Sequence, residues 1–322
     1  MIITVFLVSA ISIATVLLYG CVGEIITEKA GHLNLGIPGI MCMGTAGGCL
    51  GTSLYMGALE NTANASWLLL FLISMLFAVV FAAALGGIYA LLTVTLRCNQ
   101  NITGLAITIF GAGATDFLMS FVDRTHFDAA GKLISKSLPF ADKLGAFGTV
   151  VFGHGVFVYL AIAIALLTTF VLNKTRVGLH LRAVGESPAT ADAAGINVIA
   201  YKYVAILVGS GIAGLGGFYY IMDYIKGSWE NAMTIEAFGW LAIALVIFVL
   251  WKPHFGIFGA FLFGACYIVA FVLSNVSSTQ KEIIKMVPYV VTIVVLIVTS
   301  IFDNKENQPP ASLGLPYFRE DR

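Results

Sequence analysis

The chain has 322 residues, of which 59% are hydrophobic and 11% are charged, and its mean hydropathy is +0.95. This composition is far from that of soluble globular domains and predicts a protein of the lipid bilayer. The formal net charge at pH 7 is zero, so the composition gives no sign of a nucleic-acid partner.

Apolar segments of about 20 residues, the length of a helix that crosses a bilayer, recur along the whole chain. They predict an all-α, polytopic membrane protein with about nine or ten transmembrane helices in a single domain, residues 1–322. The expected spans are about 2–21, 36–57, 66–96, 102–121, 150–172, 202–222, 236–251, 255–275 and 285–302. The run 66–96 is too long for one ordinary crossing. A strong tilt, an extension beyond the membrane and a break at Gly86-Gly87 are the open alternatives, and the break would add a tenth helix.

Two interruptions containing Gly and Pro stand at the start of predicted spans: NLGIPG at residues 34–39 and KPHFGIFG at residues 252–259. Broken helices expose backbone dipoles at membrane depth and form the binding site in many transporters. We therefore expect a permeation path near these interruptions, with simple turns at the water interface as the alternative.

The predicted span 102–121 carries polar side chains at membrane depth, where such residues are functional candidates. Asp116 lies toward the outer end of this span, where it either faces a cavity or extends to the outer surface. Thr103 and Thr108 are weaker candidates. Their spacing does not place them on one helix face, so we expect at most one of them to line a cavity.

A polar interval between spans, residues 173–201, contains the sequence LRAVGESPATADAAGIN. Ser187 suits a helix N-cap, Pro188 suits the first helical position, and Gly195 stands where a left-handed C-terminal cap is needed. These residues predict a short helix over about 188–194. Two turns of helix are not stable alone in water, so we expect this helix to dock against a partner, with an ordinary surface loop as the alternative.

The next predicted span contains GSGIAG at residues 209–214, which matches the G-x-G-x-x-G pattern of dinucleotide sites. No strand is predicted before it, so helix packing is the better interpretation: Gly209, Ala213 and Gly217 recur every four residues and permit a close helix neighbour. The chain has no phosphate loop of the form G-x-x-x-x-G-K-[ST], and its histidines and cysteines lack metal-ligand spacing. We expect no cofactor, no metal and no ATP hydrolysis by this chain itself.

Lysine and arginine residues are unevenly divided between the two sides of the predicted membrane domain. Ten of the 17 fall on the side of the 173–201 interval, which is therefore expected to be cytoplasmic, together with the tail of about 303–322. The ten are Lys29, Arg97, Lys174, Arg176, Arg182, Lys202, Lys252, Lys305, Arg319 and Arg322. The predicted location is the cell (inner or cytoplasmic) membrane.

The sequence VGLHLRAVGESPATADAAGINV closely resembles the cytoplasmic coupling segment of ABC-transporter permeases of the branched-chain amino acid, simple sugar and nucleoside importer superfamily. Ser187 stands where Asn is commoner, and both residues cap helices. Residues 23–45 are similar to the N-terminal pattern of this superfamily, although Pro38 replaces the usual Glu, and residues 214–264 resemble its nucleoside-type branch. The coupling pattern is filled by Gly178, Arg182, Ala183, Val184, Gly185, Glu186, Pro188, Ala191, Gly195 and Ile196.

The resemblance implies a type II importer-like permease fold that works by alternating access with separate ABC ATPase subunits. It also implies a second permease subunit, identical or homologous, and an extracytoplasmic substrate-binding protein. The coupling segment, about 174–201, would dock on the ATPase, with Gly185 and Gly195 setting the angles at which the chain enters and leaves the short helix. The candidates for coupling to the ATPase are Arg182, Gly185, Glu186, Ser187, Pro188, Ala191, Asp192 and Gly195.

The resemblance also orders the candidates for the substrate path. Related sugar permeases carry a polar group in a helix break at the motif that matches Asn34, and Thr108 stands where relatives often have Asn. We expect Asn34, Thr108 and Asp116 to lie along the path, and nucleosides to be the permeant. A simple sugar or a branched-chain amino acid as permeant, and a secondary transporter without an ATPase, are the alternatives.

Overall fold

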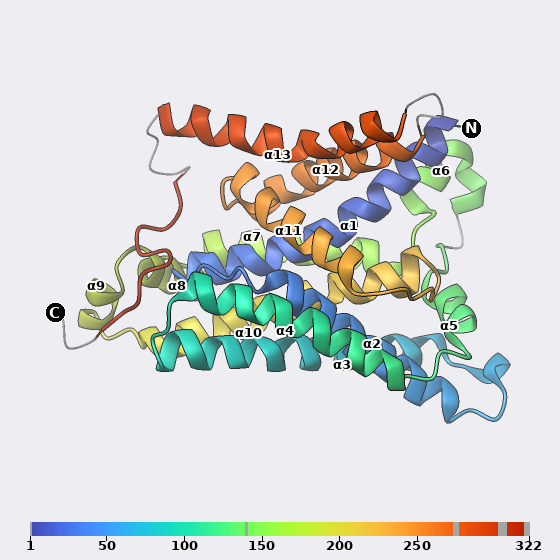
Figure 1. Cartoon of the computed structure of the whole chain (residues 1–322), viewed down its shortest axis with the longest axis horizontal. Helices are drawn as coiled ribbons and strands as arrows, with labels where there is room; N and C mark the ends of the chain where they lie inside the picture. Colours follow the sequence, from blue (N-terminus) through green and yellow to red (C-terminus); the bar gives the residue numbers. More distant parts are fainter. Residues whose placement is uncertain (1, 139–140, 273–276, 302–307, 319–322) are drawn as a thin grey trace.

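The computed structural model describes residues 2–138, 141–272, 277–301 and 308–318 (Figure 1). This part of the chain is helical and contains no β-strand, which confirms the predicted all-α class. Short 3-10 turns (η1, Thr62–Asn64; η3, Ala141–Leu144) and π-helical turns (η2, Leu91–Thr95; η4, Tyr220–Tyr224) join or extend the helices. The α-helices are α1 (Ile2–Lys29), α2 (Ile37–Gly57), α3 (Trp67–Ala90), α4 (Gln100–Phe121), α5 (Phe127–Ile134), α6 (Gly145–Phe152), α7 (Val156–Lys174), α8 (Arg176–Glu186), α9 (Pro188–Ala193), α10 (Val198–Tyr219), α11 (Met233–Phe248), α12 (Pro253–Val272) and α13 (Ser278–Ile301).

Each predicted span corresponds to a helix in the described part of the chain: α1, α2, α3, α4, α7, α10, α11, α12 and α13. Five helical segments there are long and apolar enough to cross a membrane, judged by length and composition. They are Ile3–Lys29, Trp67–Thr95, Gln100–Phe121, Val156–Lys174 and Val198–Tyr224, and Met233–Phe248 and Pro253–Val269 are shorter apolar helices. The chain is therefore a multi-pass membrane protein.

The long run 66–96 is one helical segment, and the break considered at Gly86-Gly87 is absent. α3 passes through both glycines without interruption and continues into the π-helical turn η2. A Cβ atom at Gly86 would lie 2.1 Å from Ser210 Oγ in α10. The glycine therefore permits close packing of two helices and does not interrupt either of them.

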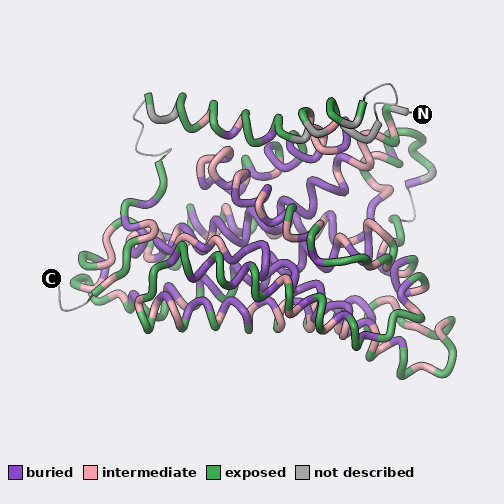
Figure 2. The backbone as a smooth tube through the Cα atoms, in the orientation of Figure 1, coloured by how far each residue is buried: buried purple, intermediate pink, exposed green. Residues whose placement is uncertain are grey.

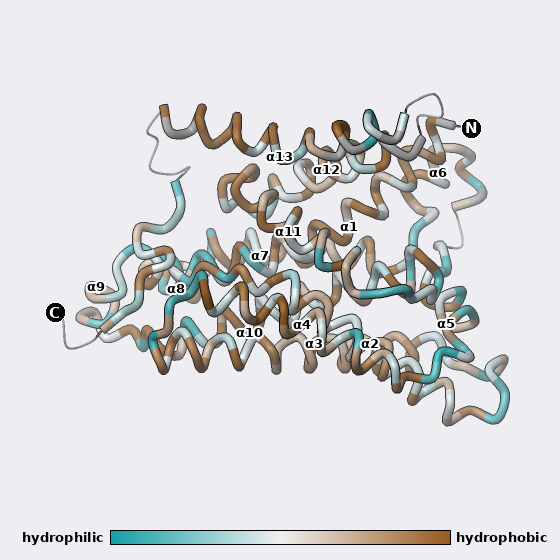
Figure 3. Tube along the Cα trace, in the orientation of Figure 1, coloured by the Kyte–Doolittle hydropathy of each residue, from teal (hydrophilic) through white to brown (hydrophobic). Residues whose placement is uncertain are grey.

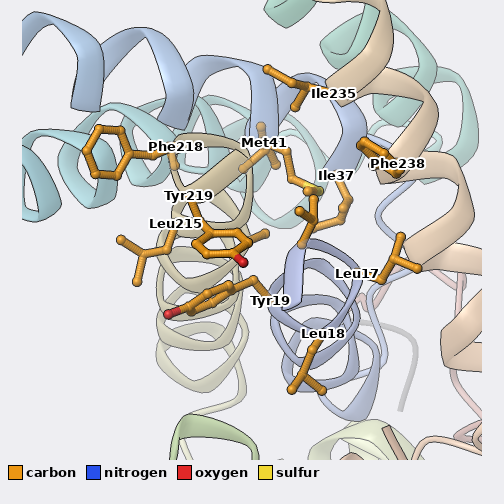
Figure 4. Packing of buried hydrophobic residues seen from close by; sticks show 14 of the residues in the cluster. Leu17, Leu18, Tyr19, Ile37, Met41, Leu215, Phe218, Tyr219, Ile235 and Phe238 are labelled. Atoms are coloured by element: carbon orange, nitrogen blue, oxygen red, sulfur yellow. The ribbon is translucent and has the colours of Figure 1, made fainter. Parts of the chain in front are cut away.

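The buried core is built around α1, which packs along α10 and α12 and also contacts α7 and α11. The Tyr19 hydroxyl of α1 donates a hydrogen bond to the Phe157 carbonyl of α7 at 2.7 Å. Figure 4 shows Tyr19 and Tyr219 extending into one layer of the core, with Phe218 on the same helix as Tyr219. Such close packing of side chains, together with buried hydrogen bonds, holds helices together where lipid removes the usual hydrophobic driving force.

Small residues set the distance between α10 and its neighbours. A Cβ atom at Gly209 would lie 2.4 Å from the Gly23 carbonyl oxygen of α1, and one at Gly217 would lie 2.3 Å from the Met41 carbonyl oxygen of α2. A Cβ atom at Gly23 would in turn lie 3.0 Å from the Ala213 methyl group. Gly209, Ala213 and Gly217 thus face two helices at backbone contact distance.

The two ends of the helix bundle differ in what they carry. α8, α9 and the C-terminal residues 308–318 lie at one end, the left in Figure 1, and α5, α6 and the start of α1 lie at the other. Hydrophilic residues gather at both ends, while the middle of the bundle is mainly apolar (Figure 3). The most buried segments run through the centre, and α13 lies at the edge with much of its surface exposed (Figure 2).

Candidate functional site

The short helix α9 begins and ends close to the residues predicted. Ser187 is its N-cap, with an Oγ atom that accepts a hydrogen bond from the Thr190 amide at 3.4 Å, and Pro188 occupies the first turn. At the other end, Gly195 has a φ of +83°, and the Ile196 amide donates to the Ala191 carbonyl at 3.0 Å. This is a glycine-capped helix end, so the predicted helix over 188–194 is confirmed.

A second helix, α8, precedes α9 and was not predicted. Thr175 caps it by accepting a hydrogen bond from the Gly178 amide at 3.2 Å, and Leu181 and Val184 are buried. The apolar spacing of Val177, Leu181 and Val184 was the sequence signal for this helix. The polar interval is thus a helix pair with its corner at Ser187.

The two faces of α9 have different surroundings. Ala191 is buried, in a small cluster with Val184 of α8 and Val198 of α10. The outer face exposes Ala189, Thr190, Ala193 and Ala194, and Pro188 and Asp192 are half-buried. Ala191 therefore supports α9 from beneath, and the surface available to a partner is formed by the four exposed residues.

Gly185 is needed for close packing, and the expectation that it needs an unusual backbone angle is wrong. It lies within α8 and is not among the residues with positive φ. A Cβ atom at Gly185 would lie 2.3 Å from the Lys29 carbonyl oxygen at the end of α1. The missing side chain therefore brings α8 into direct contact with the central helix of the bundle.

Residues 308–318, here called the C-terminal strap, lie across α8 and α9. Ser312 donates to the Gly185 carbonyl through its amide (3.0 Å) and its hydroxyl (2.6 Å). The Ala311 amide donates to Glu186 Oε2 at 3.3 Å, and the Tyr317 hydroxyl donates to Asp192 Oδ2 at 2.8 Å. The strap thereby ties both helices of the segment to one another. The remaining residues of the predicted tail, 303–307 and 319–322, lie outside the described residues.

The strap also reaches the start of α4. The Gln100 side-chain amide donates to the Leu315 carbonyl at 3.4 Å, and the Arg97 guanidinium lies 4.7 Å from the centre of the Phe318 ring. Arg182, another of the residues predicted to couple to the ATPase, is half-buried within α8, and its Nε atom has no hydrogen-bond partner.

The first helix interruption places Asn34 and Thr108 in one neighbourhood. Asn34 is fully buried, its amide donates to Glu24 Oε1 at 2.9 Å, and its Oδ1 accepts from the Gly36 amide at 3.0 Å. The Thr108 hydroxyl donates to the Leu35 carbonyl at 2.7 Å. The Asn34 Nδ2 group has no hydrogen-bond partner, so it is a free donor at this break.

Asp116 lies apart from this pair, eight residues or about 12 Å farther along α4. It is exposed, and its Oδ1 accepts a hydrogen bond at 3.0 Å from the amide of Ala232, the N-cap residue of α11. The sequence predicts that Asp116 either faces a cavity or extends to the outer surface, and neither prediction included this link between α4 and the start of α11.

Two buried glutamates join the helix interruptions, and they were not among the predicted site residues. Glu24 is bonded to the Asn34 amide, and Glu28 Oε2 accepts a hydrogen bond from Trp251 Nε1, next to the second interruption. Both carboxyl groups lie in the last turns of α1, which extends to Lys29 and so beyond the predicted span of about 2–21, and for this reason the sequence did not mark them as acids within a span. A Cβ atom at Gly239, in the middle of α11, would lie 2.4 Å from Pro38 Cα, so α11 packs directly against the start of α2.

The described residues contain no group of three or more His, Cys, Asp or Glu side chains placed to hold a metal ion. The arrangement consists of a supported, capped helix at one end of the bundle and a polar helix break connected to it through α1.

Comparisons with known proteins match residues 6–296 to the family described as the permease component of the branched-chain amino acid transport system. The chain is similar to the putative glucose ABC transporter permease protein TsgC13 of Haloferax volcanii, with 33% identity over 80% of this chain and 74% of that protein. It is 29% identical to the nucleoside ABC transporter permease protein NupC of Lactococcus lactis, over 95% of this chain and 94% of that protein. It is also 29% identical to the guanosine ABC transporter permease protein NupQ of Bacillus subtilis, over 96% and 95%. No solved structure matches the chain.

Proposed function

Because the chain belongs to the family of permease components of the branched-chain amino acid transport system, we propose that it is the membrane permease of an ATP-driven nucleoside importer. In this proposal separate ATPase subunits hydrolyse ATP at the cytoplasmic face, where α9 and the C-terminal strap lie. A second permease subunit completes the pathway, and an extracytoplasmic binding protein delivers the permeant to the end that carries α5 and α6.

The observation that carries the proposal is the geometry of α9. This helix lies at one end of the bundle, is capped at both ends and exposes Ala189, Thr190, Ala193 and Ala194. Small side chains let a partner approach the helix backbone closely. The opposite face packs through Ala191 against Val184 of α8 and Val198 of α10, so a movement of α9 would be passed to both helices.

The path from α9 to the helix break supports a coupling role. Gly185 contacts the Lys29 carbonyl, which ends α1, and α1 carries Glu24, whose carboxylate accepts from the Asn34 amide. A movement of α8 and α9 during ATP-driven closure would therefore reach the polar break through one rigid helix. Asn34 is the proposed permeant contact because its Nδ2 donor is unoccupied, with Thr108 as the supporting residue that positions the Leu35 carbonyl.

Nucleosides are the proposed permeant because two relatives that align over nearly their full length are named nucleoside and guanosine permeases. A sugar is the second candidate because the putative glucose permease has a higher identity, although over a shorter part of the chain. Both permeants carry hydroxyl groups that an amide donor such as Asn34 can bind.

The proposal is tested by purifying the tagged chain from its native membrane, identifying the proteins that copurify, and measuring uptake of labelled adenosine, ribose, glucose and leucine. We expect an ABC ATPase to copurify and adenosine uptake to require ATP. Uptake of glucose or ribose without adenosine would select the sugar alternative. Purification without any ATPase, combined with uptake that is indifferent to ATP, would overturn the proposed function.

A further inference from the structure

A cavity of about 390 Å³ lies between α9, the strap and the end of η2. This volume falls within the range of about 300–1,000 Å³ that is typical of small-molecule sites. The polar residues that line the cavity come from five separate segments of the chain. They are His32, Thr93, Arg97, Asp192, Asn197, Lys202 and Tyr317.

The main indication of a bound ligand in this cavity comes from Lys202. It lies near the start of α10, is 2% exposed, and its Nζ atom makes no hydrogen bond. Burial of an ammonium group without a partner is strongly unfavourable, and an anion bound beside Nζ would remove this cost. The Tyr317 ring, centred 6.0 Å from Nζ, stands at the outer limit for a cation–π contact and does not replace an anion.

The rest of the lining favours an anion at the same place. Arg97 adds a second cation, held by the Phe318 ring. Burial, and secondarily the charge of Lys202, lower the pKa of His32 to about 3. At neutral pH its ring is therefore neutral and can donate one N–H. The one carboxylate among the polar lining residues, Asp192, accepts the Tyr317 hydroxyl and so has at least one of its oxygens engaged.

We propose that this cavity is a binding site for a phosphate group, in which Lys202 and Arg97 supply charge and His32 supplies a neutral donor. A lysine ammonium with a forked guanidinium is a combination that recognises phosphate oxygens. The phosphate is carried either by a lipid headgroup or by a small soluble phosphate compound, because the cavity lies at the polar end of the bundle. This site is distinct from the permeant path and does not depend on the proposed transport function.

An occupied site would link three parts of the coupling region. The connection from α9 to α10 lines the cavity with residues 195–199, and Tyr317 of the strap and Arg97 before α4 line its other walls. A bound phosphate would therefore hold α9 against the bundle, and its loss would free the helix pair.

The test uses the full-length chain in nanodiscs, with binding measured by phosphorus NMR and by thermal shift at constant ionic strength. Soluble probes are inorganic phosphate and glycerol 3-phosphate, added to phosphatidylcholine nanodiscs. The lipid arm compares nanodiscs with and without phosphatidylglycerol. We expect saturable binding in one arm and a loss of affinity of about tenfold or more in Lys202→Met, with affinity retained in Lys202→Arg. The control Lys136→Met, at an exposed site near α5, should bind like the unaltered chain.

A second measurement does not depend on the folding of the Lys202 variant. Ile199→Cys places a thiol on an exposed position of the cavity lining, and Ala193→Cys places one on the outer face of α9, each in a Cys98→Ser background. The probe that binds should slow thiol labelling at position 199 and leave position 193 unchanged. Absence of saturable binding in both arms, or binding that neither slows labelling at 199 nor weakens in Lys202→Met, would overturn the proposal.

Discussion

Two glycines flank the corner and the end of α9, and each acts for a different physical reason. Gly185 has an ordinary helical backbone and leaves room for the Lys29 carbonyl. Gly195 has open space around it but a φ of +83°, which side chains other than glycine rarely adopt. A packing constraint at Gly185 and a conformational constraint at Gly195 thus act at the two ends of the segment that contains α9.

Gly195→Val tests the conformational constraint. A β-branched residue at this angle costs about 1–2 kcal/mol or more and should shift the end of α9, so ATP-driven uptake should fall while membrane insertion stays normal. The matched control is Gly195→Asn, since Asn tolerates the left-handed region and should keep most of the uptake. Normal substrate-stimulated uptake in Gly195→Val would show that the end of α9 has no role in coupling.

Thr108→Val tests the hydrogen bond that supports the first helix interruption. The hydroxyl donates to the Leu35 carbonyl in a buried site, so its removal should lower the free energy of unfolding by about 1 kcal/mol. Thr108→Ser keeps the hydroxyl and serves as the control. Reversible unfolding in mixed micelles provides the measurement, and equal stability of the Val and Ser variants would contradict the assignment.

Residues whose role is local could be identified from the sequence, and residues whose role depends on distant contacts could not. Ser187, Pro188 and Gly195 act within one or two turns of α9, so their types and spacing were sufficient to predict this helix and its two ends. The inward position of Ala191 depends on Val184 and Val198, and the contact of Asp116 depends on Ala232, more than 100 residues away. No local pattern contains that information.

At the scale of elements, α9 is stabilised by contacts with neighbouring segments more than by hydrogen bonds within the helix. Its six residues are too few for a stable isolated helix, and its support comes from α8, α10 and the strap. The strap differs from these helices because residues 308–318 contain no helix and are held by separate hydrogen bonds. Removal of the strap should therefore affect α9 while changing the rest of the bundle less than removal of α8 or α10 would.

Ending the chain at residue 307 should therefore loosen α8 and α9. The bonds to Gly185, Glu186 and Asp192 are lost, and their amides should exchange hydrogen faster by on the order of tenfold or more. Hydrogen exchange followed by mass spectrometry measures this directly.

Tyr317→Phe provides a graded control for the truncation. It removes the hydroxyl that bonds to Asp192 and keeps the ring, so exchange should increase near α9 and remain normal in the middle of α8. If the truncated chain exchanges at the same rate as the full chain throughout α8 and α9, the strap does not support the segment.

Most of the helices could be predicted because apolar length is a strong signal, but their ends and continuity could not. From sequence, the run 66–96 allowed a break at Gly86-Gly87, a strong tilt or an extension beyond the membrane, and the role of Gly86 in packing depends on its contact with Ser210 of α10. α8 escaped prediction because an amphipathic helix of 11 residues beside a polar corner resembles a loop in composition.

At the scale of the molecule, the central helix of the bundle joins the proposed coupling surface at one end to a polar break. The break before α2 and the break before α12 are each bonded to α1, the first through Glu24 and Asn34 and the second through Glu28 and Trp251. In a permease with this arrangement, a movement of α9 would be transmitted to both breaks through α1.

This arrangement predicts the orientation of the chain in the membrane. In a Cys98→Ser background, a membrane-impermeant maleimide should label Ala193→Cys from the cytoplasmic side and Lys136→Cys from the outside, because the two positions lie at opposite ends of the bundle. Labelling of both positions from the same side, or in the reverse order, would invalidate the proposed direction of coupling.

The most direct test of the account combines ATP hydrolysis and adenosine uptake in proteoliposomes that contain the purified complex. Ala193→Arg places a large charge on the exposed face of α9 without disturbing the buried face, and Asn64→Arg makes a matched change in an exposed loop. We predict that Ala193→Arg abolishes uptake while leaving a basal ATP hydrolysis that no longer responds to the binding protein, and that Asn64→Arg preserves both activities. Undiminished, ATP-dependent uptake in Ala193→Arg would contradict the claim that ATP hydrolysis acts on this chain through α9.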